Sequence, residues 1–441
     1  MNFAIAATLG AVLAAPPAHA GQAQPDRPER ADAALLSSGI RRSDLRADVI
    51  VSWNSLAHDI AFAEDQFLTF KGQRALAVMH LAMHDALNAI VPIYDTYAFR
   101  EGARPAHPIA ATAQAAHDVL LSQYPGQRAA LADQLSRWLS GVPNGELRDH
   151  GVALGRAAAA AVLAQREGDG WDFAGTYTFG DGAGRYQTTP PWNGFVAQPG
   201  FRFATPFVLE TPDQFRPSPA PRLGTEAYAR AFREVKEYGA AASAGRTEEQ
   251  TGYAIWWMEF AEGSVNRLAR QLVTERQMHL WRAARLFAHM GVALYDVYVA
   301  TWDAKYEYDH WRPYTAIRAA HLDANPGTAP DANWQPLRPT PPFPEYPSAH
   351  AAGCAASFGV LAHALGDRLR FTMATTTAPP GMPVRSFGSF SAAAAECADS
   401  RVRLGWHFRY ATEAGLVLGR QVARYASRHA LRARHGAAGA R

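Results

Sequence analysis

The segment KYEYDHWRP, residues 305–313, ends a long run of helical sequence pattern that begins near Glu275. Lys305 and Arg312 are seven residues apart, so two helical turns are expected to bring both cations to one face. Pro313 cannot continue a normal helix and predicts that this helix ends just after Arg312. The pattern indicates an anion site beside the helix, with an ordinary solvated helix face as the alternative.

A second segment, PSAH at residues 347–350, has the form of a helix start. Ser348 is a good N-cap residue, and Pro347 can enter a helix but not extend it. The free backbone N–H groups at such a start favour an anion. His350 would then lie in the first turn, where it can donate or accept a proton. The alternative is an ordinary Ser cap followed by an exposed histidine.

The third segment places His407 six residues after Arg401. On a continuous helix the two side chains would point about 240° apart. They converge only if the helix breaks between them, and Gly405 is the natural break. A neutral imidazole there can bond the central atom of an anion, as nucleophile or as ligand. A plain helix C-terminus is the alternative, but the three segments together predict a pocket for phosphate or its mimic vanadate.

The composition narrows the class of protein. The chain has 441 residues and a net charge of +3, which gives no reason to expect nucleic acid or an anionic membrane as partner. Residues 1–20 resemble a secretory signal peptide with a small-residue cleavage site at 18–20, which predicts a periplasmic or secreted protein. No later segment approaches the ~18 uncharged apolar residues of a membrane span.

The chain has two cysteines, and both flank the proposed site. Cys354 lies one turn after His350, and Cys397 lies one turn before Arg401. A disulfide and two buried thiols both remain open, because spacing in sequence cannot fix the separation of two Cα atoms.

Helical patterns dominate the chain from Val49 onward, so an all-α fold of helical bundles is expected. No strand pattern and no internal repeat is evident. His80 and His84 share one helix face but lack a third metal ligand, so a helix-surface or interior position is favoured. The expected division is a signal peptide (1–20), a flexible leader (21–45), an N-terminal helical region (46–167), an ordered aromatic, Pro- and Gly-rich excursion (168–222), a C-terminal helical bundle carrying the site (223–430) and a flexible tail (431–441).

The ordered set K-x6-RP, PS-x-H and SR-x5-H resembles the superfamily that unites type 2 phosphatidic acid phosphatases, bacterial acid phosphatases and vanadium-dependent haloperoxidases. Residues 341–350, 302–313 and 400–410 are most similar to the soluble bacterial branch of the haloperoxidases. The resemblance implies that vanadate is bound in a C-terminal, four-helix-bundle-like core. Halide and a small organic molecule would be the substrates beside hydrogen peroxide. A secreted phosphatase that hydrolyses phosphomonoesters through a phosphohistidine is the second reading, and a non-catalytic oxyanion-binding protein is the third.

The resemblance also assigns roles to individual residues. His407 would be the axial ligand of vanadium, His350 the acid–base residue opposite it, and Lys305 would polarise bound peroxide. The oxyanion would be held by Lys305, Arg312, Ser348, the backbone of Ala349, and Arg401. Ala349 stands where the commonest pattern has Gly, which keeps the backbone donor but adds a methyl group. The aromatic Phe343 does not settle the halide. Asp303, Asp309 and Glu345 are candidates for an acid that orients Arg401 or His350.

Overall fold

The computed structural model describes residues 32, 35–102 and 104–434. Within this part the protein is all-α apart from one two-stranded sheet, which confirms the expected fold class. The N-terminal region contains α2 (Asp48–Asp65), α3 (Lys71–Ile90), α4 (Pro108–Gln123), α5 (Arg128–Ser140) and α6 (Glu146–Gln165). The C-terminal region contains α7 (Glu226–Tyr238), α8 (Glu248–Trp256), α9 (Ala261–Glu275), α10 (Leu280–Tyr308), α11 (Pro313–Arg318), α12 (Ala349–Leu365), α13 (Phe390–Arg403) and α14 (Arg409–His429). Short 3-10 helices are η1 (Arg42–Leu45), η2 (Pro125–Gln127), η3 (Pro199–Phe203) and η4 (Ala320–Leu322).

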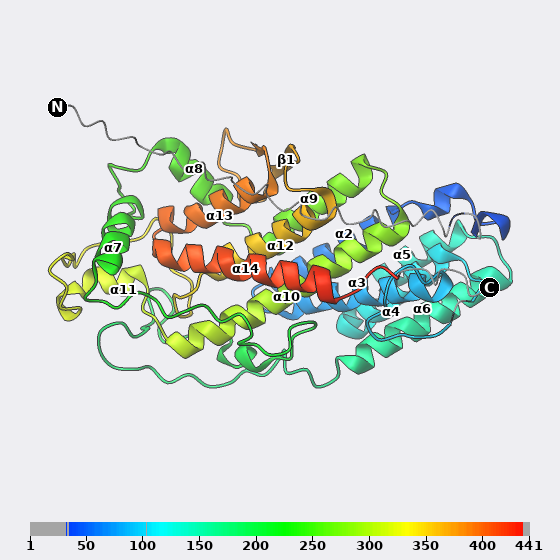
Figure 1. Ribbon diagram of the computed structural model, residues 1–441, viewed down its shortest axis with the longest axis horizontal. Coiled ribbons are helices and arrows are strands. Elements are labelled where there is room, and N and C mark those ends of the chain that lie inside the picture. The colour runs from blue at the N-terminus through cyan, green and yellow to red at the C-terminus, as the bar shows by residue number, and fades with distance from the viewer. Residues whose placement is uncertain (1–31, 33–34, 103, 435–441) are drawn as a thin grey trace, which may run out of the picture.

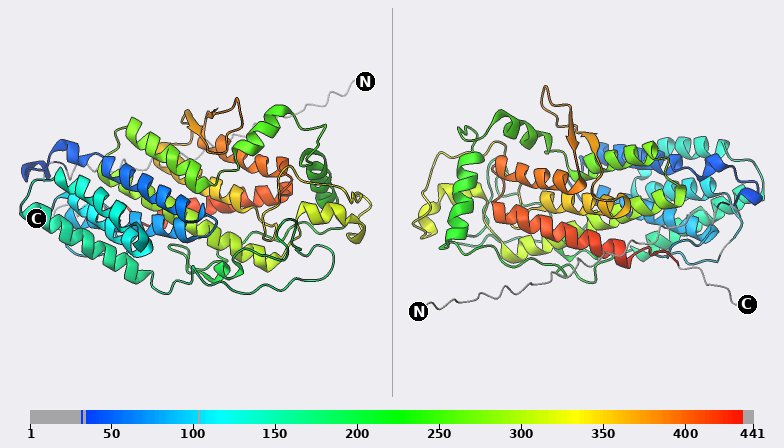
Figure 2. Two further views of the ribbon diagram at one scale, coloured as in Figure 1. Left: turned by 180° about the vertical axis from the view of Figure 1, so that it is seen from behind. Right: turned by 45° about the horizontal axis from the view of Figure 1, so that its top comes forward.

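The helices form two groups that share the long helix α10. Figure 1 shows α3 to α6 toward one end of an elongated molecule and α12 to α14 toward the other, and both views in Figure 2 agree. Helix α10 packs on α3 in the first group and on α12 and α14 in the second. Helix α12 is the centre of the second group, because it also contacts α9 and α13 and is buried along most of its length. No helix among the described residues is long and apolar enough to cross a membrane.

Helices α12 and α14 approach each other closely through two glycines. A Cβ atom on Gly415 would lie 2.5 Å from the carbonyl oxygen of Ser348, and one on Gly419 would lie 2.3 Å from that of Ala352. Real Cβ atoms do not come this close, so the contact requires glycine at both positions. This glycine pair therefore sets where the first turn of α12 lies against α14.

The same contact occurs between α4 and α6 in the N-terminal region. A Cβ atom on Gly151 would lie 2.7 Å from the carbonyl oxygen of His107, and one on Gly155 would lie 2.3 Å from that of Ala111. As in the C-terminal pair, the two glycines are four residues apart, and the first one faces the N-cap of its partner helix.

The excursion over 168–222 lies against helix α10. Buried Asp296 on α10 accepts hydrogen bonds from the backbone N–H groups of residues 207–209, at 2.6, 2.8 and 3.0 Å. Farther along the same helix, the N–H of Tyr186 donates to the carbonyl of Asp309 at 3.0 Å. The excursion therefore covers the end of α10 that leads into the candidate site.

Two expectations about the chain ends need correction. The flexible leader is wrong for residues 35–45, because Leu35, Ile40 and Leu45 are buried in the core. The flexible tail is wrong for residues 431–434, where Leu431 is buried and the Arg434 N–H donates to the carbonyl of Ile93 at 2.8 Å. In both cases a few apolar side chains pack into the hydrophobic core. The signal-peptide prediction over 1–20 and the rest of the leader and tail predictions lie outside the described residues, apart from Asp32.

The sequence pattern also missed a β-hairpin. Strands β1 (Phe371–Ala374) and β2 (Val384–Phe387) pair antiparallel between α12 and α13, with Phe371 opposite Phe387. Each strand has only four residues, which is too short for an alternating pattern to stand out in a mostly helical chain.

Candidate active site

Lys305 and Arg312 meet at the site, but not on one helix face. Helix α10 ends at Tyr308, where Asp309 adopts a left-handed conformation with φ of 51° and reverses the chain. Arg312 is the N-cap of α11, and Pro313 is the first residue of that helix. The predicted helix through Arg312 is therefore wrong. Pro313 starts a helix, because its missing N–H costs nothing at that position.

The segment 343–345 holds both cations in place. The Lys305 ammonium donates to the carbonyls of Pro344 at 2.7 Å and Glu345 at 3.0 Å. The Arg312 Nε donates to the carbonyl of Phe343 at 2.9 Å. The Phe343 ring lies 5.0 Å from Lys305 Nζ and 4.9 Å from Arg312 Cζ, so one aromatic face contacts both charges.

Both cations are fully buried, and the desolvation is strong. Burial, and then the nearby Arg312, lowers the pKa of Lys305 well below its usual range. Burial also lowers the pKa of Arg312 to about 10. Two cations held out of water next to each other favour any anion that can neutralise them.

The segment 347–350 starts helix α12, as predicted. Ser348 is the N-cap, and its hydroxyl accepts a hydrogen bond from the N–H of Ala351 at 3.4 Å. The N–H groups of Ala349 and His350 precede the first intrahelical bond and are available to a ligand. Burial, and then the charge of Arg401, lowers the pKa of His350 well below its usual range, while a hydrogen bond with the Trp257 backbone opposes the shift. His350 is therefore neutral at pH 7.

The break at Gly405 is also confirmed. Helix α13 ends at Arg403, and Gly405 has a φ of 78°, a conformation that favours glycine. Arg401 donates through Nε to the hydroxyl of Ser400 at 2.9 Å and through Nη2 to the carbonyl of Trp257 at 2.6 Å. Burial lowers the pKa of Arg401 to about 9.

Two neighbours fix the tautomer of His407. Its Nδ1 lies 2.9 Å from Oε1 of Glu345, which also accepts the backbone N–H of Phe408 at 2.9 Å. Its Nε2 lies 3.1 Å from Nη1 of Arg312, a group that can only donate. The proton therefore sits on Nδ1, and Nε2 carries a lone pair. Burial, followed by the charges of Arg312 and Lys305, lowers the pKa of His407 well below its usual range.

The expected acid partner of Arg401 or His350 is not where the sequence suggested. Asp303 pairs with Arg216, with Nε to Oδ2 at 2.6 Å, outside the site. Asp309 accepts a hydrogen bond from the hydroxyl of Tyr177. Glu345 is the one of the three candidates in the site, but it orients His407. Its position in a run of Pro and aromatic residues was the available signal, because a carboxyl group there is expected to be buried and paired.

Several buried polar atoms of the site could form a further hydrogen bond with an anion. Among the described residues, nothing forms a hydrogen bond with Nη2 of Arg312, Nη1 of Arg401 or Nε2 of His350. Lys305 uses two of its three N–H groups, which leaves one available. The two guanidinium N–H groups and the Lys305 N–H are buried donors that fit an oxyanion, and Nε2 of the neutral His350 is an acceptor beside them. Oε2 of Glu345 is the opposing unpaired acceptor, and burial raises the pKa of this carboxyl to about 8.

The chain is similar in sequence and in fold to known proteins. Residues 285–436 match the family model of the VCPO second helical-bundle domain. Vanadium chloroperoxidase of Curvularia inaequalis is 36% identical over 87 residues, which cover 18% of this chain and only 14% of that protein. The crystal structure of the first bacterial vanadium-dependent iodoperoxidase has a TM-score of 0.75 and 23% identity, over 89% of this chain and 98% of that one. A holo-type bacterial vanadium-dependent chloroperoxidase has a TM-score of 0.64 and 19% identity, over 80% and 91%.

The sequence match and the structural match cover different extents of the chain. The family model falls on α10 to α14, the helices that contribute Lys305, His350, Arg401 and their neighbours. The structural similarity extends over both helical groups and shows the common fold. Residues 285–436 are therefore similar in sequence to the VCPO second helical-bundle domain, and the overall fold is that of the bacterial vanadium-dependent iodoperoxidase and chloroperoxidase.

Proposed function

We propose that this protein is a vanadium-dependent haloperoxidase that uses hydrogen peroxide to oxidise a halide, which then reacts with a small organic molecule. The observation that carries the proposal is the set of buried, unpaired donors around the Nε2 lone pair of His407. A site of this kind fits vanadate. The oxygens of vanadate accept hydrogen bonds, and its central atom can take an imidazole ligand.

The chemistry of the residues present fits vanadate. The ligand from the protein would be Nε2 of His407, and the oxygens would be held by Lys305, Arg312, Ser348, the N–H of Ala349, and Arg401. When bound, vanadate supplies the activation of peroxide and the two-electron oxidation of halide. The extra methyl group of Ala349 leaves its N–H at the helix start, so the substitution of Gly by Ala does not remove a donor.

The protein's own contribution is charge, orientation and proton transfer. His350 is partly exposed, yet its Nε2 is buried and unpaired, so it connects the surface to the site. Because it is neutral at pH 7, it can accept a proton from incoming peroxide at Nε2. Lys305 presents its third N–H to an oxygen atom and favours negative charge there. Glu345 keeps the lone pair of His407 directed toward the anion.

A phosphomonoesterase is the second candidate, and the lone pair on Nε2 of His407 is the observation that favours it. With a phosphate ester, this nitrogen would form a bond to phosphorus while the leaving oxygen takes a proton from His350. That step needs a protonated His350, whereas burial and Arg401 keep its pKa low. A neutral His350 is better suited to accept a proton from peroxide than to donate one to a leaving alkoxide.

The test is to purify the protein, load it with orthovanadate and measure peroxide-dependent oxidation of iodide, bromide and chloride beside hydrolysis of p-nitrophenyl phosphate. We expect halide oxidation that requires vanadate. Hydrolysis of the ester without halide oxidation would overturn the proposal in favour of the phosphatase. His407→Ala should abolish turnover and weaken vanadate binding measured by calorimetry. Val417→Ala, at an exposed position on α14, is the matched control and should do neither.

We also propose that the protein is exported, which the signal-like residues 1–20 support. N-terminal sequencing of the protein recovered from the periplasm or the medium should find a chain that begins near Gly21. Full-length protein confined to the cytoplasm would contradict this.

A further inference from the structure

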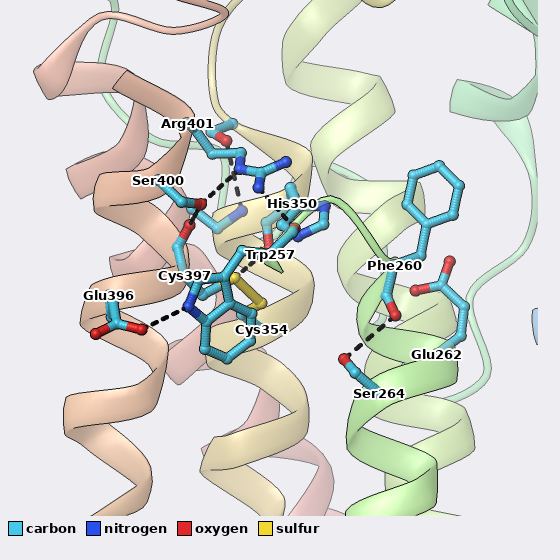
Figure 3. The surroundings of a disulfide bond; sticks show 12 residues. Trp257, Phe260, Glu262, Ser264, His350, Cys354, Glu396, Cys397, Ser400 and Arg401 are labelled. Atoms are coloured by element: carbon cyan, nitrogen blue, oxygen red, sulfur yellow. Dashed lines mark hydrogen bonds between the residues drawn. A yellow bond between two sulfur atoms is a disulfide. The ribbon is translucent and has the colours of Figure 1, made fainter. Parts of the chain in front are cut away.

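A disulfide joins the two helices that carry His350 and Arg401. Cys354 on α12 and Cys397 on α13 are bonded, with their Cα atoms 6.6 Å apart, and both residues are fully buried. Of the two possibilities left open by the sequence, the disulfide is therefore the one found. Figure 3 shows it next to His350 and Arg401.

The disulfide closes a ring of contacts around the site. His350 lies one helical turn before Cys354, and Arg401 lies one turn after Cys397. On the opposite side, the carbonyl of Trp257 accepts a hydrogen bond from Nη2 of Arg401 at 2.6 Å and also bonds to the imidazole of His350. The distance between the two functional side chains is thus fixed on one side by a covalent bond and on the other by a single shared carbonyl.

Small side chains make most of the non-covalent contacts between the two helices. Helix α12 presents mainly Ala, Gly and Ser, and α13 begins with a run of alanines at 392–395. The rings of Phe358 on α12 and Phe390 on α13 also stack, with their centroids 6.2 Å apart. Arg401 also comes to rest near the positive charges of Lys305 and Arg312 around His407. The disulfide adds a covalent link between the helices that carry Arg401 and His350.

We propose that the Cys354–Cys397 disulfide is a positioning element of the oxyanion site, which holds Arg401 at the distance from His350 that anion binding and turnover require. This rests on the proposed oxyanion site. Reduction would leave the helices folded but let α13 move relative to α12. A dithiol such as dithiothreitol supplies the two electrons and two protons, forms its own cyclic disulfide, and leaves Cys354 and Cys397 as thiols.

The chain allows a clean test because it has no other cysteine. Phosphate binding to vanadate-free protein would be measured by calorimetry at 20 °C, before and after reduction, with thiol titration to show that the disulfide is open. We expect the Kd for phosphate to rise about tenfold, the loss expected when one charge-assisted hydrogen bond is misplaced. Reoxidation should restore the original Kd.

Two variants separate positioning from general stability. The double variant C354A/C397A cannot form the link and should bind phosphate as weakly as the reduced protein. Its kcat in the vanadate-loaded halide assay should fall by about a hundredfold, as misplaced groups commonly cause. Leu361→Ala, at a buried position on the same helix, should lower the melting temperature but leave the Kd for phosphate unchanged.

The outcomes distinguish this inference from the proposed function. A Kd for phosphate that stays within twofold after complete reduction, and in C354A/C397A, would overturn the positioning role even if halide oxidation is robust. A protein that binds phosphate only when oxidised but never oxidises halide would support the positioning role and contradict the haloperoxidase. If both the reduced protein and C354A/C397A unfold at 20 °C, the disulfide serves fold stability and the proposal is overturned.

Discussion

Glu345 accepts the Nδ1 proton of His407 at 2.9 Å, and this contact, together with the Arg312 N–H at Nε2, fixes the tautomer of His407. We expect Glu345→Leu to let His407 populate both tautomers and to leave the Phe408 N–H unpaired. Phosphate binding should weaken by about tenfold or more. Nitrogen-15 NMR of the imidazole, which distinguishes the two tautomers, measures this without any assay of turnover.

Glu345→Gln is the matched control, because its side-chain oxygen can still accept both hydrogen bonds while the group can no longer ionise. We expect it to keep the tautomer and most of the phosphate affinity. If Gln is as damaging as Leu, the negative charge of Glu345 matters more than its role as acceptor.

The Phe343 ring contacts two buried cations at once, so its removal should affect the ligand-free protein. We expect Phe343→Leu to lower the free energy of unfolding by about 1–3 kcal/mol, since each cation–π contact in a desolvated site contributes roughly 0.5–2 kcal/mol. Denaturant unfolding monitored by circular dichroism gives the value. Phe343→Tyr retains the ring and should cost less; equal losses for both variants would remove the ring–cation contact as the cause.

The burial of His310 predicts how the stability of the fold depends on pH. Burial lowers its pKa to about 3 from 6.5, and its Nε2 lies 2.7 Å from the hydroxyl of Tyr410. Because the unfolded chain binds a proton below pH 6.5 and the folded one does not, this group stabilises the fold above that pH and its contribution is lost as pH falls toward 3. His310→Gln should therefore lose about 1.4 kcal/mol less stability than the wild type between pH 7.5 and pH 5.5. Identical pH dependence in both proteins would contradict the buried, neutral state of His310.

Gly415 should be intolerant of even a methyl group. In Gly415→Ala the new Cβ would lie 2.5 Å from the carbonyl of Ser348, so the start of α12 must move. We expect a loss of about 1–3 kcal/mol in stability together with weaker phosphate binding. Gly151→Ala creates the same conflict with His107 in the other bundle and should cost stability alone. Equal phosphate affinity in the two variants would show that the first turn of α12 does not depend on this contact.

The parts of the site that the sequence predicted correctly are local. Ser348 caps a helix and Gly405 breaks one because the preferences of those residues act within a few positions along the chain. The convergence of Lys305 and Arg312 was predicted for the wrong reason, since the left-handed turn at Asp309 replaces the expected two turns of helix. The pairing of Glu345 with His407 joins residues 62 positions apart, and no local preference encodes it.

The two close helix pairs, α4 with α6 and α12 with α14, show one unit of architecture used twice, although no repeat is evident in the sequence. In each pair the first glycine touches the N-cap carbonyl of the partner helix. The difference lies at the next residue, which is Pro108 in one copy and Ala349 in the other. Proline has no N–H, so the first position of the N-terminal copy lacks the backbone donor that the C-terminal copy offers. The same close packing is therefore present in both helix pairs, but only the C-terminal pair has a backbone N–H at the first position of the partner helix.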